Sequence, residues 1–366
     1  MGREIITSWT QIDKWFREAG AACSYDWETT SLNYLEMEPV GLALCDGKRS
    51  CYIPFITKIV LEGINIIRHN FQHSRLWIAH NQSFDLKCCR KFLGIEPDNI
   101  WCTLVGAKLL DENRFGKKPY SLKTLAVDWL GKFDVVKYDE VAHDPTSKAF
   151  AEYAMDDAEN TYELYQHEYP RLEKEGLLYL AEEIEMPFQK TLADLEINGV
   201  SVDKEKLNEF STHCRRLLTT LQFELCYIFG KTPIRQIDLF GVEYFDIPIN
   251  FNSPGDLIRC IEQLGFIIDE KTDKGNPSVG KVYLEKMKGK HEFFDLLWRY
   301  RKLQKLYNAF IEPADDLIDV DGRIRPSYNL VRTGRLSCSS PNLQQLPNNK
   351  KEKLDLNYRE VFIPGK

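Results

Sequence analysis

The chain has 366 residues, 43% hydrophobic and 28% charged, with a formal net charge of −7. This length exceeds one typical core, so we expect two or three domains. No run approaches the ~18 apolar residues of a membrane span, and the N-terminal residues are too polar for a signal peptide, which predicts a cytoplasmic protein without a membrane partner. The ten cysteines include no C-x-x-C pair, so we expect reduced, mostly buried thiols.

The charge is unevenly distributed along the chain. Residues 250–366 carry 20 Lys and Arg against 16 Asp and Glu, a net charge of +4, whereas residues 1–249 carry −11. The acidic N-terminal part suits a metal-binding region, and the mildly basic C-terminal part suits a region that contacts phosphates. Ordinary solvated surface charge would also explain much of this pattern.

The first part of the chain predicts strands followed by alternating strands and helices. A helix is expected over Trp9–Ala19, where apolar residues recur at helical spacing before Gly20, and a strand over Ala21–Trp27. Asp46-Gly47 between two apolar runs predicts a hairpin. The other expected elements are strands at Val40–Cys45, Ser50–Ile53 and Leu76–Ala79 and helices at Ile59–Ile67, Phe84–Phe92, Thr103–Leu110, Ser121–Trp129 and Ser147–Tyr169. Together they predict a mixed α/β domain that ends near residue 175.

Beyond Leu178 the pattern is mainly helical, with helices expected at about 180–198 and 203–229. A polar loop at 269–277 precedes another long helix near Phe293–Phe310. The apolar side of this last helix predicts core packing. Its other side is either a solvated surface or a track for phosphates, and it carries Arg299, Arg301, Lys302 and Lys305.

Four acidic side chains and one phenol recur in the first 160 residues. Asp26 and Glu28 stand two apart at the end of a predicted strand, so they face the same way. Asp85 opens a predicted helix after a short strand, and Tyr153 and Asp157 are one turn apart on another helix. Hard divalent cations prefer carboxylate oxygens. The pattern therefore predicts two metal ions about 4 Å apart over a phosphodiester, with the phenol beside the attacking water.

Three segments carry a resemblance to a known family. They resemble the three exonuclease motifs of the DEDD superfamily, tyrosine branch, and they are Asp26-Trp27-Glu28-Thr29-Thr30-Ser31-Leu32, Ala79-His80-Asn81-Gln82-Ser83-Phe84-Asp85 and Tyr153-Ala154-Met155-Asp156-Asp157. The resemblance implies a ribonuclease H-like fold, two Mg²⁺ or Mn²⁺ ions as cofactors, and removal of nucleotides from a 3′ end.

The same resemblance implies a role for individual residues. It assigns Tyr153 to positioning the water, and it assigns the metal ions to Asp26, Glu28, Asp85 and Asp157. Asn81 would support the second motif, and Thr29 and Leu32 would line the terminal nucleotide. Trp27 stands where the family often has a smaller residue.

The string from Arg332 to Pro347, R-T-G-R-L-S-C-S-S-P-N-L-Q-Q-L-P, resembles a specific segment of family A DNA polymerases, the bacterial DNA polymerase I type. In that family the segment contacts the backbone and minor groove of the primer–template. Its Gly and Pro residues predict tight, irregular backbone, and its arginines offer fork-shaped donors. The implied substrate-binding residues are Arg332, Arg335, Asn342 and Gln344.

This second resemblance covers nearly the whole chain, because Glu185-Met186-Pro187 and Phe251-Asn252-Ser253-Pro254 also match the family. It implies a 3′–5′ exonuclease domain at 1–175, a thumb region at 180–318 and the N-terminal part of a palm at 319–366, where unpaired strand edges are expected. The palm carboxylate motifs and the fingers are missing, so we expect no polymerisation from this chain alone. A truncated chain and a second polypeptide that carries the remaining parts both stay open.

The implied function is proofreading, in which the 3′-terminal phosphodiester of DNA is hydrolysed in the cytoplasm of a bacterial or phage-infected cell. The implied partners are a single-stranded DNA 3′ end and a primer–template duplex. Two alternatives remain. A free-standing ribonuclease D-like exoribonuclease would have the same chemistry but would leave the T-G-R-L-S run unexplained. A DNA-binding accessory part of a split polymerase would have no need of intact carboxylates at all four positions.

Overall fold

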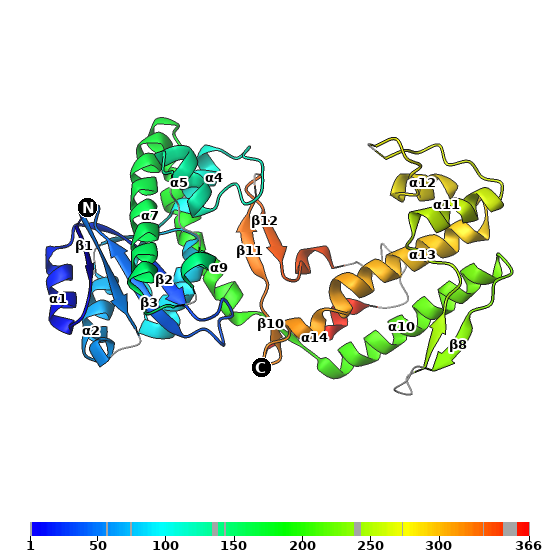
Figure 1. Ribbon diagram of the computed structural model, residues 1–366, viewed down its shortest axis with the longest axis horizontal. Coiled ribbons are helices and arrows are strands. Elements are labelled where there is room, and N and C mark those ends of the chain that lie inside the picture. Colours follow the sequence, from blue (N-terminus) through cyan, green and yellow to red (C-terminus); the bar gives the residue numbers. More distant parts are fainter. Residues whose placement is uncertain are drawn as a thin grey trace. The chain divides into compact units, whose positions relative to one another are not determined.

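The computed structural model describes residues 2–55, 58–73, 75–133, 138–142, 144–237, 243–272, 274–331, 333–346 and 357–365, without the side chains of 58–61 and 243. By internal contacts the chain forms two units (Figure 1). The first comprises Met1–Gly199 and Arg325–Ser339, and the second comprises Val200–Ile324 and Ser340–Lys366. The functional regions expected at 1–175, 180–318 and 319–366 are defined by resemblance rather than by contacts and stay a prediction.

A six-stranded mixed sheet forms the centre of the first unit, in the order β1-β4-β3-β2-β5-β6. β3 pairs antiparallel with β2 and β4, whereas the β1–β4, β2–β5 and β5–β6 pairs are parallel. The strands are β1 Gly2–Ile5, β2 Ala22–Thr29, β3 Pro39–Cys45, β4 Arg49–Pro54, β5 Leu76–Ala79 and β6 Asn99–Cys102. The edge strand β1 was not predicted, because its four residues are mostly exposed and lack an alternating pattern.

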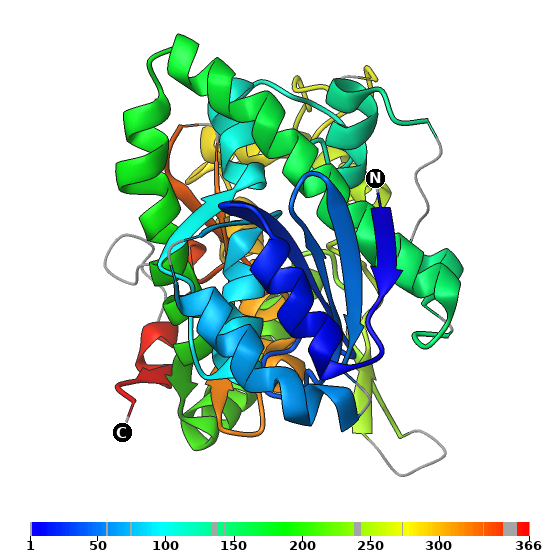
Figure 2. The same cartoon turned by 90° about the vertical axis from the view of Figure 1, so that its left-hand side faces the viewer.

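Helices cover both faces of this sheet. Figure 2 shows α1 and α2 in front of the strands and the long α7 behind them. The helices are α1 Trp9–Glu18, α2 Lys58–Gln72, α3 Gln82–Cys88, α4 Thr103–Leu110, α5 Leu122–Leu130, α6 Tyr138–Val141, α7 Lys148–Lys174, α8 Leu178–Leu180 and α9 Met186–Asn198. Single π-helical turns follow α3 and α8, at Cys89–Leu93 and Ala181–Glu185. The predicted mixed α/β fold is confirmed.

Strand β2 separates two hydrophobic cores. Tyr25 and Trp27 are buried with side chains of α1 and α2 on one face. Ser24 points to the other face, where its hydroxyl donates to the carbonyl of Ala158 on α7 at 2.6 Å. Because successive strand residues alternate between faces, the even-numbered side chains of β2 must all point toward α7.

Several elements extend further than predicted. β2 continues to Thr29, α2 to Gln72, and α7 passes through Pro170 to Lys174. A proline inside a helix removes one backbone hydrogen bond, and the predicted helix ended at Tyr169, just before this proline. Leu172 beyond the proline is fully buried. Its packing holds the last turn in helical form.

A β-hairpin formed by residues 327–339 belongs to the first unit, although it lies far along the chain. Its strands are β11 Ser327–Leu330 and β12 Leu336–Ser339, paired antiparallel. Glu196 at the end of α9 accepts a hydrogen bond from the backbone of Tyr328 at 2.9 Å. Lys108 on α4 donates to the carbonyl of Leu330, also at 2.9 Å. These contacts dock the hairpin on the exterior helices of the first unit.

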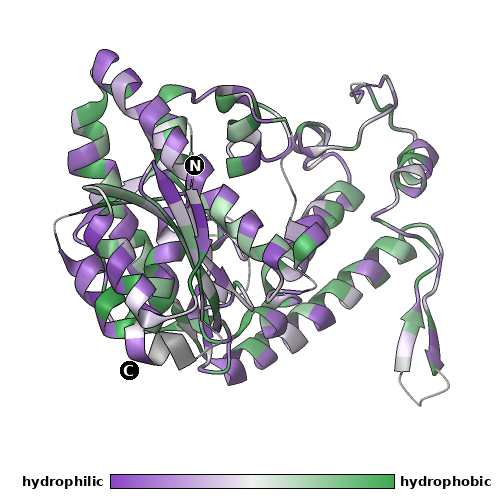
Figure 3. Ribbon diagram, turned by 60° about the vertical axis from the view of Figure 1, so that its left-hand side comes forward, coloured by the Kyte–Doolittle hydropathy of each residue, from purple (hydrophilic) through white to green (hydrophobic). Residues whose placement is uncertain are grey.

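Two long helices, α10 and α13, form the core of the second unit. Leu221 and Leu225 on α10 are buried in one cluster with Phe293, Leu297 and Tyr300 on α13. In Figure 3, the long helix α10, which leads to the hairpin of β8 (Ile234–Ile237) and β9 (Glu243–Asp246), has alternating green and purple bands, as burial of one side requires. The helices of this unit are α10 Lys204–Tyr227, α11 Pro254–Gln263, α12 Lys281–Met287, α13 Glu292–Leu306 and α14 Ala314–Leu317.

The second unit also contains short strands and turns. A three-stranded sheet has the order β10-β7-β13, so both β10 and β13 have an antiparallel partner in β7. The strands are β7 Val200–Val202, β8 Ile234–Ile237, β9 Glu243–Asp246, β10 Arg323–Ile324 and β13 Phe362–Ile363. A π-helical turn at Tyr307–Ile311 follows α13, and 3₁₀ turns lie at Leu343–Gln345 and Tyr358–Val361.

Two expectations drawn from composition can be compared with the structure. All ten cysteines are buried and none of them forms a disulfide, as predicted. Among the described residues, none of the helices combines the length and the hydropathy that a bilayer-spanning segment needs.

We expect Trp77→Ala to lower the free energy of unfolding by about 3–5 kcal/mol, because it leaves a large cavity in the first core. Trp77 is fully buried, and its ring stacks on Phe71 with centroids 3.8 Å apart. Urea unfolding measures the loss. Trp9→Ala is the control, because that side chain is 45% exposed. Equal effects of the two substitutions would contradict this packing.

Candidate functional site

The alternation of β2 directs two acidic side chains to the face covered by α7. Asp26 pairs with Ala43 and Glu28 with Gly41 on the neighbouring strand β3. Glu28 is only 7% exposed, whereas Asp26 is half-buried. The intervening Trp27 lies on the opposite face, where its ring packs against those of Phe55 and Phe92. Its side chain therefore lies in the core rather than beside the two acids.

The third acid, Asp85, comes from the first turn of α3 and is almost fully buried. Its Oδ1 accepts a hydrogen bond from the backbone N–H of Trp27 at 3.1 Å. The chain turns from β5 into this helix at Asn81, whose backbone is left-handed with φ 66°. An asparagine adopts this conformation more readily than most residues, which accounts for its place at this turn.

Helix α7 supplies the fourth acid and the phenol. Tyr153 and Asp157 are one turn apart and are 8% and 6% exposed. Burial and the neighbouring Asp157 raise the pKa of the Tyr153 phenol, and Tyr153 in turn acts to lower the pKa of Asp157. The structure thus places all five predicted side chains on α3, α7 and the α7-facing side of β2.

Burial raises the pKa of each of the four carboxyl groups, and repulsion by other acids of the set adds to this effect for Asp26, Glu28 and Asp85. Burial is the main cause for Asp26, whose pKa lies well above its usual value, and Glu28, Asp85 and Asp157 add to it. Burial, with Asp157, raises the pKa of Glu28 to about 7. Burial raises the pKa of Asp85 to about 8, against the hydrogen bond from Trp27. These mutual effects indicate that the acids share one site.

Two side chains near this site were not predicted from the sequence. The ammonium group of Lys123, on α5, forms an ion pair with Asp157 and lies 4.2 Å from the ring centroid of Tyr153. The ring of Tyr138, on the short helix α6, lies 6.1 Å from that of Tyr153 and is 45% exposed. Spacing along the sequence contains no signal for either one, because the packing of α5 and α6 on α7 brings them here.

The other residues implied for the terminal nucleotide surround the end of β2. The hydroxyl of Thr29 donates to the carbonyl of Ser31 at 2.9 Å. Leu32 is 81% exposed, as a side chain available to a ligand would be. Their contacts with a nucleotide stay a prediction, as does the supporting role of Asn81.

The carboxylate set suits hard divalent cations, since each of its four acids offers oxygen ligands. Among the described residues, no three His, Cys, Asp or Glu side chains already stand close enough together to hold one ion. Lys123 occupies an oxygen of Asp157. The chemistry of the donors and the concentration of buried negative charge therefore fit a metal site, with the side chains still to close around the ion.

The residues of the T-G-R-L-S string are divided between the two units. Arg335 is exposed at the turn between β11 and β12, where Gly334 has φ 71°. Asn342 and Gln344 belong to the second unit, and Gln344 is exposed. Arg332 lies outside the described residues. The DNA contacts implied for all four stay a prediction.

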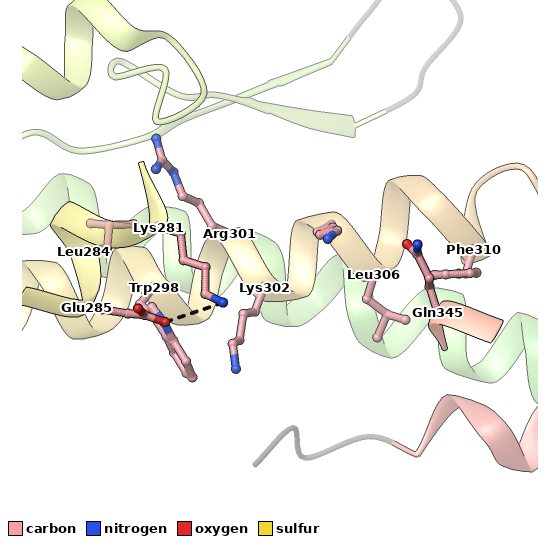
Figure 4. Close-up of a pocket in the computed structure, with 10 residues that line it drawn as sticks. Lys281, Leu284, Glu285, Trp298, Arg301, Lys302, Leu306, Phe310 and Gln345 are labelled. Atoms are coloured by element: carbon pink, nitrogen blue, oxygen red, sulfur yellow. Dashed lines mark ion pairs between the residues drawn. The ribbon is translucent and has the colours of Figure 1, made fainter. Parts of the chain in front are cut away.

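The second unit has a cavity of about 460 Å³ along α13 (Figure 4). Its lining includes Trp298, Arg301, Lys302, Lys305, Phe310 and Gln345. Lys302 lies 3.6 Å from the ring centroid of Trp298. Arg301 turns inward, since it donates to the carbonyl of Val279 and burial lowers its pKa. On the basic side of α13, Arg301 thus has a structural contact, while Lys302 and Lys305 line the cavity.

Comparison with known proteins agrees with both halves of this description. Residues 3–173 match the family model described as 3′-5′ exonuclease, and residues 234–366 match that of DNA polymerase family A. The solved POL domain of Pol1 from M. smegmatis, in a complex with DNA primer-template and dNTP, has a TM-score of 0.79 and 19% identity, over 99% of this chain and 59% of that one. At this identity the likeness shows the fold.

Curated relatives are similar over most of the chain. DNA polymerase I of Borreliella burgdorferi is 28% identical over 359 residues, covering 93% of this chain and 37% of the relative. The DNA polymerase of Bacillus phage SP01 is 28% identical over 365 residues, with 84% and 39% covered. The thermostable DNA polymerase I of Thermus filiformis is 32% identical over 219 residues, with 58% and 24% covered.

The chain therefore combines a region similar to 3′-5′ exonucleases, residues 3–173, with a region similar to family A DNA polymerases, residues 234–366. The chain is thus similar to DNA polymerase family A along most of its length. It spans about two fifths or less of the length of these curated relatives.

We expect Asp85→Asn to stabilise the metal-free protein at pH 9 by about 1–3 kcal/mol and to have little effect at pH 4. The folded protein holds the Asp85 proton up to about pH 8, whereas the unfolded chain loses it near pH 4. Wild-type stability should therefore fall as the pH rises through this window, and the amide removes that cost.

Thermal unfolding in EDTA between pH 4 and 9 measures this effect. The exposed Glu175 serves as the control, through Glu175→Gln. A stability gain from Asp85→Asn that is independent of pH would show that the carboxyl group ionises normally in the folded protein.

Proposed function

We propose that the first unit is a metal-dependent 3′–5′ exonuclease of the proofreading type, which hydrolyses the 3′-terminal phosphodiester of DNA. The observation that carries this proposal is the convergence of Asp26, Glu28, Asp85 and Asp157 from three elements, where Glu28, Asp85 and Asp157 each raise the pKa of another acid in the set. Such a concentration of buried negative charge is costly unless cations compensate it. The family match of residues 3–173 supports the same activity.

Two Mg²⁺ or Mn²⁺ ions are the cofactors that these ligands suit. Asp26, Glu28, Asp85 and Asp157 would hold them through carboxylate oxygens. Bound cations of this kind activate a water and stabilise charge on the leaving oxygen. The half-buried carboxylate of Asp26 and the buried carboxylate of Asp157 would turn toward the ions, while Asp85 stays fixed by the Trp27 N–H.

Tyr153 is suited to orienting the attacking water rather than to removing its proton. Burial and the neighbouring Asp157 raise the pKa of the phenol, so it stays protonated at neutral pH. The protonated phenol can still accept a hydrogen bond from a water through the lone pairs on Oη. A water held in this way directs its own lone pair away from the phenol, toward a phosphorus atom.

The balanced reaction is hydrolysis. A bond forms between the water oxygen and the terminal phosphorus, and the bond from phosphorus to the 3′ oxygen breaks. The 3′ oxygen takes up a proton, and the products are a 5′-mononucleotide and a DNA strand one residue shorter. No oxidant or further reactant is required.

The second unit is suited to holding duplex DNA. Its cavity is lined by Lys302 and Lys305 on α13, and Gln345 also borders it. Ammonium groups on a helix beside such a cavity suit contacts with the phosphate backbone. The similarity to the structure of a POL domain bound to DNA primer-template supports the same partner.

We expect Asp26→Ala to reduce 3′–5′ degradation of single-stranded DNA in Mg²⁺ by at least about 10³-fold, because electrostatic stabilisation of this kind is the largest catalytic contribution. A labelled oligonucleotide resolved on a gel measures the rate. The matched control is Glu152→Gln on α7, whose side chain is 47% exposed and lies outside the site. Undiminished activity in the Asp26 variant would refute the proposed site.

The same assay distinguishes the ribonuclease D-like alternative. Matched DNA and RNA strands are degraded side by side, and kcat/KM on DNA should be the larger. A preference for RNA would favour the exoribonuclease. The family match of residues 234–366 to DNA polymerases favours DNA.

We expect the double substitution Lys302→Gln and Lys305→Gln to weaken binding of a primer–template duplex and to flatten its salt dependence. Each ammonium–phosphate interaction that the double variant loses should reduce the magnitude of the slope of log K against log salt concentration by about 0.9. Fluorescence anisotropy between 50 and 200 mM salt measures this slope. Lys204→Gln, an exposed lysine outside the cavity, is the control. An unchanged slope would show that these lysines do not touch the DNA.

A further inference from the structure

Lys123 is the one cation of the described residues that forms an ion pair with a carboxylate of the site. We propose that it is an internal counter-ion, which a divalent cation has to displace from Asp157 in order to bind. This inference rests on the proposed metal-dependent function. It adds a residue that sets the affinity for the metal without itself being a ligand.

The backbone of Lys123 is firmly held. It lies in the first turn of α5, whose preceding residue Ser121 caps the helix by accepting a hydrogen bond from the backbone N–H of Thr124 at 3.3 Å. Leu125 on this helix is buried against Leu164 of α7. The ammonium group is therefore brought to Asp157 by two packed helices and not by a loop.

The position of this lysine has no explanation in the stability of its own helix. The N-terminal end of a helix carries a partial positive charge, so a cation in the first turn is mildly unfavourable there. The ion pair with Asp157 and the Tyr153 ring at 4.2 Å supply the compensating attraction. At this position the charge of Lys123 stabilises the acidic site and does not stabilise helix α5.

The charge of Lys123 acts on most of the site. It lowers the pKa values of Asp26, Glu28 and Asp157, in each case against the larger effect of burial. In the absence of metal, one ammonium group thus offsets part of the repulsion among the carboxylates. A divalent cation would perform the same task with twice the charge.

Lys123 and a divalent cation cannot bind the same oxygen of Asp157 at the same time. An Asp157 oxygen held by the ammonium group is not open to a metal ion, and the two cations repel one another. The side chain of Lys123 is 27% exposed, against 8% for Asp157. A flexible, partly exposed lysine can move into solvent, so metal binding is an exchange of one cation for another.

The test is direct binding of Mn²⁺ to the metal-free full chain at pH 8.5, followed by the loss of the free-ion EPR signal. Lys123→Met should lower the Kd of the site by about tenfold, because truncating a close charge pair removes both the competitor and its repulsion. Lys123→Arg, which keeps the cation, should stay within about twofold of wild type. Lys123→Gln provides the same neutral test if the methionine variant does not fold.

The matched control is Lys132→Met. Lys132 lies two residues beyond the end of α5 and pairs with Glu163 of α7 at 2.9 Å, away from the site carboxylates. This variant should bind Mn²⁺ like wild type. A similar gain in affinity here would mean that any loss of positive charge near α7 suffices, and the specific role of Lys123 would be refuted.

Asp157→Asn separates this inference from the function on which it rests. If Asp157→Asn loses Mn²⁺ binding while the neutral Lys123 variants bind no more tightly than wild type, the metal site stands and the counter-ion role fails. If wild type itself binds no Mn²⁺, both fail. Tighter binding by the neutral variants, with loss of binding in Asp157→Asn, supports both.

Discussion

The two-residue alternation of β2 is the constraint on which the first unit depends. One set of its side chains, including Tyr25 and Trp27, is locked into an aromatic core with α1 and α2. Asp26 and Glu28 therefore have to face α7, where Asp157 lies one turn beyond Tyr153. The apolar packing on one side of the sheet thus determines where the acids stand on the other. The site owes its geometry to the hydrophobic core more than to any contact among the acids themselves.

Gathering four carboxylates in this way costs free energy, because burial and like charge both oppose ionisation. The chain offsets part of that cost with three groups of different kinds. A backbone N–H of Trp27 serves Asp85, and the phenol of Tyr153 and the ammonium of Lys123 serve Asp157. None of them neutralises Glu28, whose pKa stays near 7. The remaining charge makes the site suited to divalent cations, and it lowers stability when no metal is bound.

Much of this site follows from local patterns in the sequence. Spacing of two on a strand and of four on a helix is enough to align Asp26 with Glu28 and Tyr153 with Asp157. Lys123 and Tyr138 could not be predicted in the same way, because their place depends on how α5 and α6 pack along α7. The same reason applies to the fold. Long periodic helices and the β3–β4 hairpin were predicted, whereas the docking of β11 and β12 on the first unit depends on contacts between residues more than a hundred positions apart.

The backbone of Trp27 is shared by both sides of the sheet, since its ring belongs to the core and its N–H holds Asp85. This sharing limits how the sequence can change in length. Insertion or deletion of one residue within β2 would exchange its faces, placing carboxylates in the aromatic core and a tryptophan among the acids. A change of two residues would keep the faces but shift the acids along the strand by about 7 Å, away from α3 and α7. This stretch of chain is therefore constrained in its length as well as in the size of its core-facing side chains.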